Sequence, residues 1–422
     1  MNINSDAVSK PLHKGTVISC IMISFVWSLY NTLLAPNFPF IIRSYKDEID
    51  EAMISTYIAL MTTAFFLGSV VGSIVWGWIA DRIGRKPSII ITLVLNIVCI
   101  IAFGFCDRIK LALVIRIIHG LIDGTIPISK TIQAEIANRN NIAFVSGLFF
   151  IGSSIGGLIG PLIGGYLNKE EYIQPIVDRF PIFRDHPYLF PLLIVSIVFA
   201  IITILVIFLC KETLPKAERL NSHAKDLARL ESESQDLEAS LLDKPSFKKP
   251  TVFSLLMERN TFLLVTAYTL VNLSFISYAT VYSVVVTNPH SMGGFSMNSE
   301  GVSTISSMMA PFQLLIILIV PYLGKLMLYK DIFGFSSLIY GICCVLYPLI
   351  AQLYNQSDVV IYCVLVAYNV VSSFVVMVIM NVTMILFSNV AYNEMRGVIM
   401  GACETIAGVT RCLVSSITFI LL

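Results

Sequence analysis

The chain has 422 residues, of which 56% are hydrophobic and 13% are charged, and its mean hydropathy is +0.81. A soluble protein of this size does not need so much apolar surface, so the composition predicts a membrane protein. The net charge of +1 gives no sign of a nucleic-acid partner. Most of the nine cysteines lie in apolar runs without C-x-x-C spacing, so we expect neither disulfides nor metal ligands from them, and no cofactor.

A helical membrane span needs about 20 mostly apolar residues. Eleven such stretches lie near 15–41, 53–79, 88–106, 109–137, 142–167, 188–210, 260–287, 300–324, 331–352, 358–389 and 396–422. We therefore predict an all-α membrane protein. Its parts are a six-helix bundle over 1–210, a cytoplasmic linker over 211–259 and a five-helix bundle over 260–422, pseudo-symmetric with the first but lacking a twelfth helix. The linker is interpreted as solvated, with an amphipathic helix at the membrane surface as the alternative.

The distribution of charge predicts the orientation. Basic residues precede the first span or lie in connections on that side, whereas acidic residues crowd the first connection on the opposite side. The basic ones are Lys10, Lys14, Arg82, Arg85, Lys86 and Arg139. The positive-inside rule then places the N-terminus in the cytoplasm. It leaves open whether the membrane is the plasma membrane or a vacuolar or other endomembrane.

A compact polar hairpin joins the second and third spans. Its glycines are expected to let the two helix ends approach closely, its basic residues to hold it on the cytoplasmic face, and its aspartate to need a partner at the membrane edge. The fixed residues are Gly77, Asp81, Arg82, Gly84, Arg85 and Lys86.

The fourth span carries Arg116, His119, Asp123 and Lys130 in an otherwise apolar segment. Their intervals of three, four and seven residues place all four on one helical face, which should look into a polar cavity or a partner helix. The residues among them that allow close packing or a local kink are Gly120, Gly124 and Pro127. Asp123 is the candidate proton carrier, with Arg116 holding its charge or binding an anionic group of the substrate, and His119 as the second choice. The alternative is a permanently paired structural cluster. His119 and Asp123 are too few ligands for zinc, so no metal site is expected.

The fifth span carries a glycine series that predicts a smooth helix face for very close packing. Its members are Gly147, Gly156, Gly160, Pro161, Gly164 and Gly165. Ordinary glycine-mediated packing would look the same.

Other polar residues in spans are Asn31 in the first and Glu404 and Arg411 in the eleventh. A place in the central cavity and a structural pairing are equally open for the two charged residues. An asparagine in a span more often forms an interhelical hydrogen bond.

The hairpin resembles the loop between helices 2 and 3 of the major facilitator superfamily. The glycine series resembles the antiporter motif of its drug:proton branches, and finer features, such as Trp76-Gly77 and Gly164-Gly165-Tyr166, look like the zinc-induced facilitator-like branch. The resemblance implies that Asp81 meets the start of the eleventh span and that Arg85 pairs with an acid at the end of the fourth, for which Glu135 is the candidate. It also implies that these contacts latch the outward-facing state.

We therefore expect a proton-coupled antiporter that exports a small solute, such as a metal, a metal chelator, an organic ion or a drug, by alternating access. Its partners would be the solute, protons and the lipid bilayer, with the chain acting as a monomer. One alternative is a facilitative uniporter or proton symporter for sugars or organic anions. Another is a non-transporting receptor or scaffold that uses residues 211–259. No nucleophile–base pair or phosphate loop stands out, so an enzyme is not expected.

Overall fold

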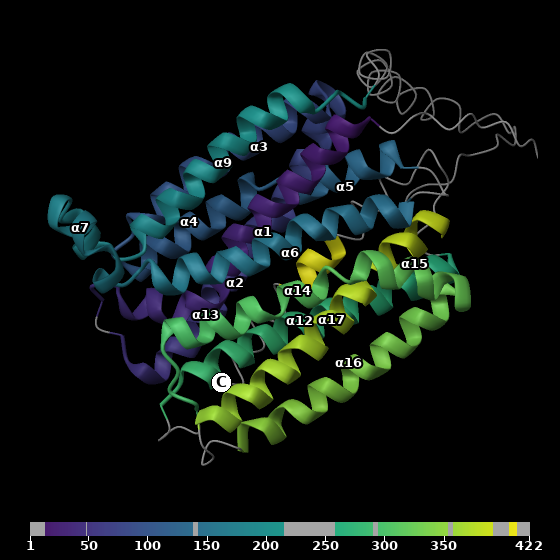
Figure 1. Cartoon of the computed structure of the whole chain (residues 1–422). Helices are drawn as coiled ribbons and strands as arrows, with labels where there is room; N and C mark the ends of the chain where they lie inside the picture. The colour runs from purple at the N-terminus through teal and green to yellow at the C-terminus, as the bar shows by residue number, and fades with distance from the viewer. Residues whose placement is uncertain are drawn as a thin grey trace, which may run out of the picture.

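A computed structural model describes residues 13–47, 49–137, 142–214, 258–289, 294–352, 358–390 and 405–411. Every regular element in these ranges is a helix, and nine stretches of helix there are long and apolar enough to cross a membrane (Figure 1). The predicted all-α membrane class is confirmed.

The helices before residue 215 are α1 (Lys14–Arg43), η1 (Glu51–Met53), α2 (Ile54–Ile83), α3 (Arg85–Gly104), α4 (Ile109–Ile122), α5 (Thr125–Ile136), α6 (Ile142–Tyr166), α7 (Glu170–Arg179), α8 (Ile182–Asp185) and α9 (Leu189–Leu209). Those after residue 257 are α12 (Arg259–Thr287), α13 (Ser299–Met308), α14 (Ala310–Gln313), α15 (Ile316–Leu326), α16 (Tyr329–Ala351) and α17 (Asp358–Val390), and residues 405–411 are also helical. We call the described residues 13–214 the N-terminal part and 258–411 the C-terminal part.

The predicted spans agree with these helices to within a few residues, with two differences. The fourth span is divided into α4 and α5, and the eighth into α13, α14 and α15. Most of the linker and of the eleventh span lies outside the described residues.

The two parts lie side by side, and α6 runs along α1 on one side and faces α13 and α14 on the other (Figure 1). We call the end at which α2 turns into α3 the hairpin end, and the opposite end, from which α7 projects, the α7 end. Side chains on the outer helices are strongly exposed, such as Phe208 at 80% and Val345 at 74%. Exposed apolar side chains of this kind are suited to contact lipid.

Candidate functional site

The fourth predicted span is broken at Asp123 and Gly124. Asp123 ends α4 with φ −79° and ψ 82°, which is not helical, so the local kink that the sequence allows in this span is a break between two helices. Trp76 of α2 packs against Gly124, and its indole Nε1 donates a hydrogen bond of 3.2 Å to the Leu121 carbonyl. This bond satisfies a backbone acceptor that the broken helix leaves free.

The Asp123 carboxylate lies at this break and is only 6% exposed. Oδ1 accepts a 3.1 Å hydrogen bond from the backbone N–H of Thr125, the first residue of α5. Oδ2 accepts a 3.1 Å hydrogen bond from the indole Nε1 of Trp27 on α1. A carboxylate at a helix N-terminus is favoured by the helix dipole and by the unpaired N–H groups there.

Arg116 forms no ion pair with Asp123, which was one of the two roles considered for it beside binding an anionic group of the substrate. Its side chain is 4% exposed, its Nε lies 3.4 Å from the Met61 carbonyl, and its guanidinium stands 4.5 Å from the Phe65 ring centroid and 5.4 Å from that of Phe38. Two helical turns of sequence separate it from Asp123, and the Phe38 and Phe65 rings lie against its guanidinium. Within the described ranges, no cation lies within ion-pair distance of Asp123.

His119 uses both of its ring nitrogens. Nε2 lies 2.6 Å from Oδ1 of Asn96, whose amide nitrogen donates to the Thr92 carbonyl, and Nδ1 lies 3.1 Å from the Tyr30 hydroxyl. Because the Asn96 amide nitrogen is a donor, its Oδ1 must accept, so Nε2 carries the proton and Nδ1 accepts from Tyr30. Neither nitrogen is left for a metal shared with Asp123. In the part of the chain that the structure describes, no three metal-ligating side chains gather.

The remaining polar candidates are dispersed. Lys130 is half-buried on α5, beyond the break, and the Asn31 amide donates to the Trp27 carbonyl within α1. Arg411 donates through Nη2 to Oδ1 of Asn272 at 2.6 Å, and its guanidinium faces Phe66 of α2. Glu404 lies outside the described residues. The structure thus brings Arg116, His119 and Asp123 into one buried region but not Asn31, Lys130 and Arg411.

The hairpin is built around Arg85, which is 9% exposed. Its Nε lies 3.0 Å from Oε1 of Glu135, the expected partner, and its Nη1 lies 2.5 Å from Oδ1 of Asp81. Gly84 has a φ of 106°, a conformation that glycine adopts without strain and that lets α2 turn directly into α3. Among the described residues, none would lie within 4 Å of a β-carbon at Gly77, so the close approach expected of this glycine is not seen in that part of the chain. The start of the eleventh span, proposed to meet Asp81, lies outside the described residues.

Two further members of the hairpin network were missed from sequence. Oε1 and Oε2 of Glu212 accept the backbone N–H groups of Arg85 at 2.9 Å and Lys86 at 3.2 Å, which caps the start of α3. Thr213 donates a short hydrogen bond to Glu135. Residues just after α9 therefore hold the hairpin and the end of α5 together. The sequence signal that could have revealed Glu212 and Thr213 is the polar segment directly after the sixth span.

The glycines of α6 allow α1 to approach it. A β-carbon at Gly152, Gly156 or Gly160 would overlap the backbone of α1, and Ser28 of α1 donates a 2.7 Å hydrogen bond to the Ser153 carbonyl of α6. Gly164 meets Leu33 and Asn37 of α1, whereas Gly165 faces Ser303 of α13. Gly147 is buried on the same helix, which Pro161 interrupts near its end.

The two parts of the chain are in direct contact at the α7 end. The Ser299 hydroxyl donates to the Gly165 carbonyl at 3.2 Å, and the hydroxyls of Tyr166 and Thr304 lie 3.0 Å apart. Deeper between the parts, Ser73 of α2 lies 3.4 Å from Thr405. The helix α6 therefore touches both α1 and α13.

Comparison with known protein families decides to which family the chain belongs. The model of the Major Facilitator Superfamily matches residues 17–415, almost the whole chain. The chain belongs to the Major Facilitator Superfamily. Because proteins of this family are transporters, membership indicates transport rather than catalysis.

Plant and fungal proteins are similar in sequence to this superfamily member. The Arabidopsis thaliana protein named "Probable peptide/nitrate transporter" is 28% identical over 305 residues, covering 70% of this chain and 62% of its own length. The Arabidopsis thaliana protein ZINC INDUCED FACILITATOR-LIKE 1 is 27% identical over 331 residues, covering 76% of this chain and 66% of its own length. The Aspergillus fumigatus multidrug transporter mfsB is 30% identical over 185 residues, 42% of this chain and 31% of its own length. The alignments therefore span from about a third to two thirds of these relatives.

Solved structures share the superfamily fold. The human organic anion transporter MFSD10 has a TM-score of 0.68 at 15% identity, covering 97% of this chain and 94% of its own. A D-xylose-proton symporter has a TM-score of 0.67 at 13% identity, covering 95% and 88%. At these identities the likeness shows the fold alone.

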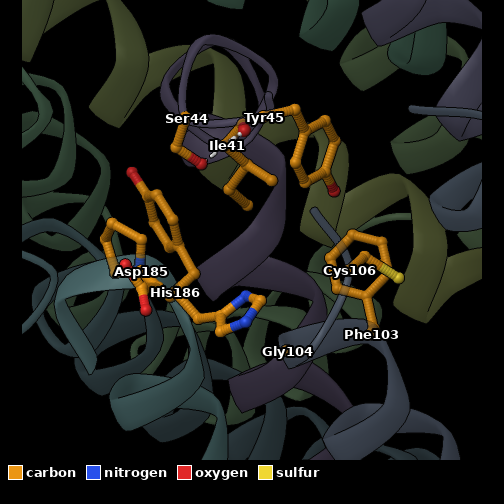
Figure 2. A pocket seen from close by; sticks show the side chains of 10 residues that line it. Ile41, Ser44, Tyr45, Phe103, Gly104, Cys106, Asp185 and His186 are labelled. Carbon is orange, nitrogen blue, oxygen red and sulfur yellow. Dashed lines mark hydrogen bonds between the residues drawn. The ribbon is translucent and has the colours of Figure 1, made fainter. Parts of the chain in front are cut away.

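Neither of two cavities in the described part of this transporter contains the residues predicted for the site. One, at the α7 end, has a volume of about 10 Å³, room for about one water molecule. Figure 2 shows Ser44 and Tyr45 on one side of it and His186 on another. The other has about 500 Å³ and an almost wholly apolar lining between α13, α14 and α17, which includes Met308, Phe312 and Cys363.

Proposed function

We propose that this chain is a proton-coupled antiporter, which moves a small solute across the membrane in exchange for protons. The observation that carries the proposal is Asp123, a buried carboxylate at a break in a membrane span that forms no ion pair with any described cation. Ionisable groups at membrane depth are costly and mark substrate or proton pathways by default. Broken helices near the membrane midplane are also typical of transporter binding sites.

The position of Asp123 fits this role. α4 has 14 residues before it, which corresponds to about 21 Å of helix, so the carboxylate lies near the middle of a 28-residue span. Its indole partner Trp27 is half-buried, so this region is not sealed on every side. A proton reaching Asp123 from one side and leaving to the other would couple proton flow to a change of access.

Alternating access needs two parts that move against each other, and we propose the N-terminal and C-terminal parts for this role. Contacts between α6 and α13 at the α7 end support a state that is closed there. The hairpin residues Asp81, Arg82, Arg85 and Lys86, with Glu135, would gate the other end, which we assign to the cytoplasmic side. Opening at the α7 end would then require these α6–α13 contacts to break.

The relatives' names guide the choice of substrates to test. They include peptide or nitrate transport, zinc-induced facilitation and multidrug transport. Metals, metal–chelator complexes, organic ions and drugs form the panel for a proton antiporter, with sugars and organic anions for the alternatives.

The test is proton movement in proteoliposomes that contain the purified protein and a pH-sensitive dye. Each solute of the panel is added with and without an imposed pH gradient. Solute-driven proton release from the vesicle lumen, in the direction opposite to solute movement, is expected. Asp123→Asn should abolish it, because the amide cannot ionise, while the folded protein and solute exchange without protons remain.

Asp178→Asn is the matched control, because Asp178 is an exposed carboxylate on α7. It should transport as the unchanged protein does. Proton movement in the same direction as the solute would replace the antiporter with a symporter. Counterflow that is independent of pH would indicate a uniporter. A folded protein that moves none of the solutes would favour a receptor or scaffold.

A further inference from the structure

Trp27 is the one described side chain of α1 that donates a hydrogen bond to the Asp123 carboxylate, across 96 residues of sequence. We propose that Trp27 is a positioning residue: protonation of Asp123 changes its hydrogen bond to Trp27, and with it the contact of α4 and α5 with α1. The proposal rests on the proton-carrier role suggested above and concerns how that site acts on the rest of the molecule.

Both oxygens of Asp123 accept hydrogen bonds in the ionised form, Oδ1 from Thr125 N–H and Oδ2 from Trp27 Nε1–H. Protonation adds one proton to one oxygen and removes the negative charge. The protonated oxygen carries the new O–H donor and keeps only part of its acceptor capacity, so it accepts an N–H hydrogen bond more weakly than a carboxylate oxygen does. One of the two hydrogen bonds is therefore weakened.

Of the two hydrogen bonds, the one from Trp27 is broken more easily than the one from Thr125. Thr125 N–H belongs to the first turn of α5, which is fixed two residues from Asp123 in the chain and needs an acceptor. Trp27 belongs to another helix and is half-buried, so its ring can turn away without breaking a helix. The break is held in place independently of Asp123, because Trp76 caps the Leu121 carbonyl and packs on Gly124.

A change at Trp27 would reach the boundary between the two parts through few contacts. α1 lies directly on the glycine face of α6, where Ser24 donates to the Phe149 carbonyl at 2.8 Å and Ser28 to that of Ser153 at 2.7 Å. The far end of α6 carries Gly165 and Tyr166, which contact α13. Closely packed helices move as units rather than deforming, so α1 and α6 would shift together.

Other titratable groups surround the same region and must be separated from Asp123. They are Tyr30 on α1, Cys99 on α3, and Arg116 and His119 on α4, whereas Lys130 of α5 lies beyond the break. The side chains that α2 contributes here, Phe65 and Trp76, do not ionise. His119 is the strongest competitor, because it bonds to Tyr30, which is three residues from Trp27 on α1.

The test uses the indole N–H signals of the protein labelled with ¹⁵N-tryptophan in lipid nanodiscs. The chain has three tryptophans, Trp27, Trp76 and Trp78, and each signal is assigned by its own substitution with phenylalanine. The Trp27 signal is expected to move as the pH falls, towards its position in Asp123→Ala, which has no carboxylate to accept the bond. The Trp76 signal is the internal reference, because its acceptor is a carbonyl that does not titrate.

Asp123→Asn keeps the size of the side chain, so it should fold and should lack the titration of the Trp27 signal. A Trp27 signal that stays fixed over the pH range in which the unchanged protein is folded would overturn the proposal. So would a titration that persists in Asp123→Asn, because it would belong to His119 or another group.

Transport separates this inference from the proposed function. Trp27→Phe keeps an aromatic ring but removes the N–H donor, and the loss of a hydrogen bond to a charged group should lower the proton-coupled rate roughly 10-fold or more. Trp78→Phe is the control with an exposed tryptophan. Unchanged proton coupling in Trp27→Phe overturns the inference and leaves the antiporter intact. A Trp27 signal that titrates in a protein without any proton-coupled transport overturns the antiporter and leaves intact the coupling between Asp123 and Trp27.

Discussion

Lys169 and Glu300 form an ion pair between the two parts of the chain, with Nζ 2.5 Å from Oε1. Lys169 follows the end of α6, and Glu300 lies in the first turn of α13. Deeper in the same contact, Ser299 donates to the Gly165 carbonyl and Tyr166 meets Thr304. The ion pair is therefore placed where opening of the α7 end would begin.

Reversing the charge of Lys169 should favour opening at the α7 end. Lys169→Glu places two carboxylates together, and because the side chains are 34% and 22% exposed, we expect a shift in the open population of about five-fold. The shift is measured as the distance between spin labels on cysteines at Arg108 and Ser296, which are exposed on different parts at this end. The double exchange Lys169→Glu with Glu300→Lys should restore the original distribution.

The control for this prediction is Lys46→Glu. Lys46 pairs with Asp107 at 3.0 Å, and both residues belong to the N-terminal part, so the distance distribution should stay the same. An equal response to both reversals would show a general charge effect and contradict a specific role of the pair.

The same ion pair predicts a response at alkaline pH. The hydrogen bond to Glu300 and its negative charge raise the pKa of Lys169 above the ordinary lysine value. A raised pKa of a cation means that the pair contributes fully below the ordinary value and is lost as the pH rises through the raised pKa. The open population should therefore increase at high pH. Lys169→Gln should lack this alkaline step in the same spin-label measurement.

Two glycines provide a matched test of helix packing. Gly156→Ala would place a β-carbon against the backbone of α1 near Phe25, whereas the β-carbon of Gly77→Ala would meet no described residue within 4 Å. Overpacking should cost Gly156→Ala about 1–3 kcal/mol of unfolding free energy. Gly77→Ala should be neutral or stabilising, because alanine has the higher helix propensity. Denaturant-induced unfolding of the protein in detergent measures both, and equal effects would contradict the close α1–α6 contact.

Arg85 and Arg82 differ in their surroundings, although they are close in sequence. Arg85→Gln leaves the carboxylates of Glu135 and Asp81 without their shared cation, and we expect a loss of about 1–3 kcal/mol. Arg82 stacks 3.8 Å from the ring centroid of the exposed Trp78, a contact that contributes about 0.5–1 kcal/mol. Arg82→Gln should therefore destabilise less in the same unfolding experiment. The reverse order would show that Arg85 does not hold the hairpin together.

Expectations that depend only on residues close together in the chain agree with the structure more often than expectations about distant residues. The spans agree because about 20 apolar residues in a row have few alternatives to a membrane helix. The Arg85–Glu135 contact was expected from a resemblance and is present in the structure. The intervals of three, four and seven residues in the fourth span did not show where its four polar residues lie, because a shared face needs a continuous helix and this one stops at Asp123.

The contacts missed from sequence join residues that are far apart in the chain. Trp27 and Asp123, Arg85 and Glu212, and Lys169 and Glu300 are each separated by more than 90 residues. A tryptophan within a span or a glutamate near the end of one has several ordinary explanations, and nothing in one sequence selects the partner.

The sequence by itself determined the membrane class, the positions of the spans and the chemical character of the fourth, because these depend on local hydrophobicity and residue type. Tertiary structure alone decided that Asp123 accepts from Trp27, that Arg116 is enclosed by Phe38 and Phe65, and that α6 contacts both parts of the chain. Hydrogen bonds and side-chain packing act over a few ångströms in space, so their partners are set by how the helices are arranged and not by distance along the chain.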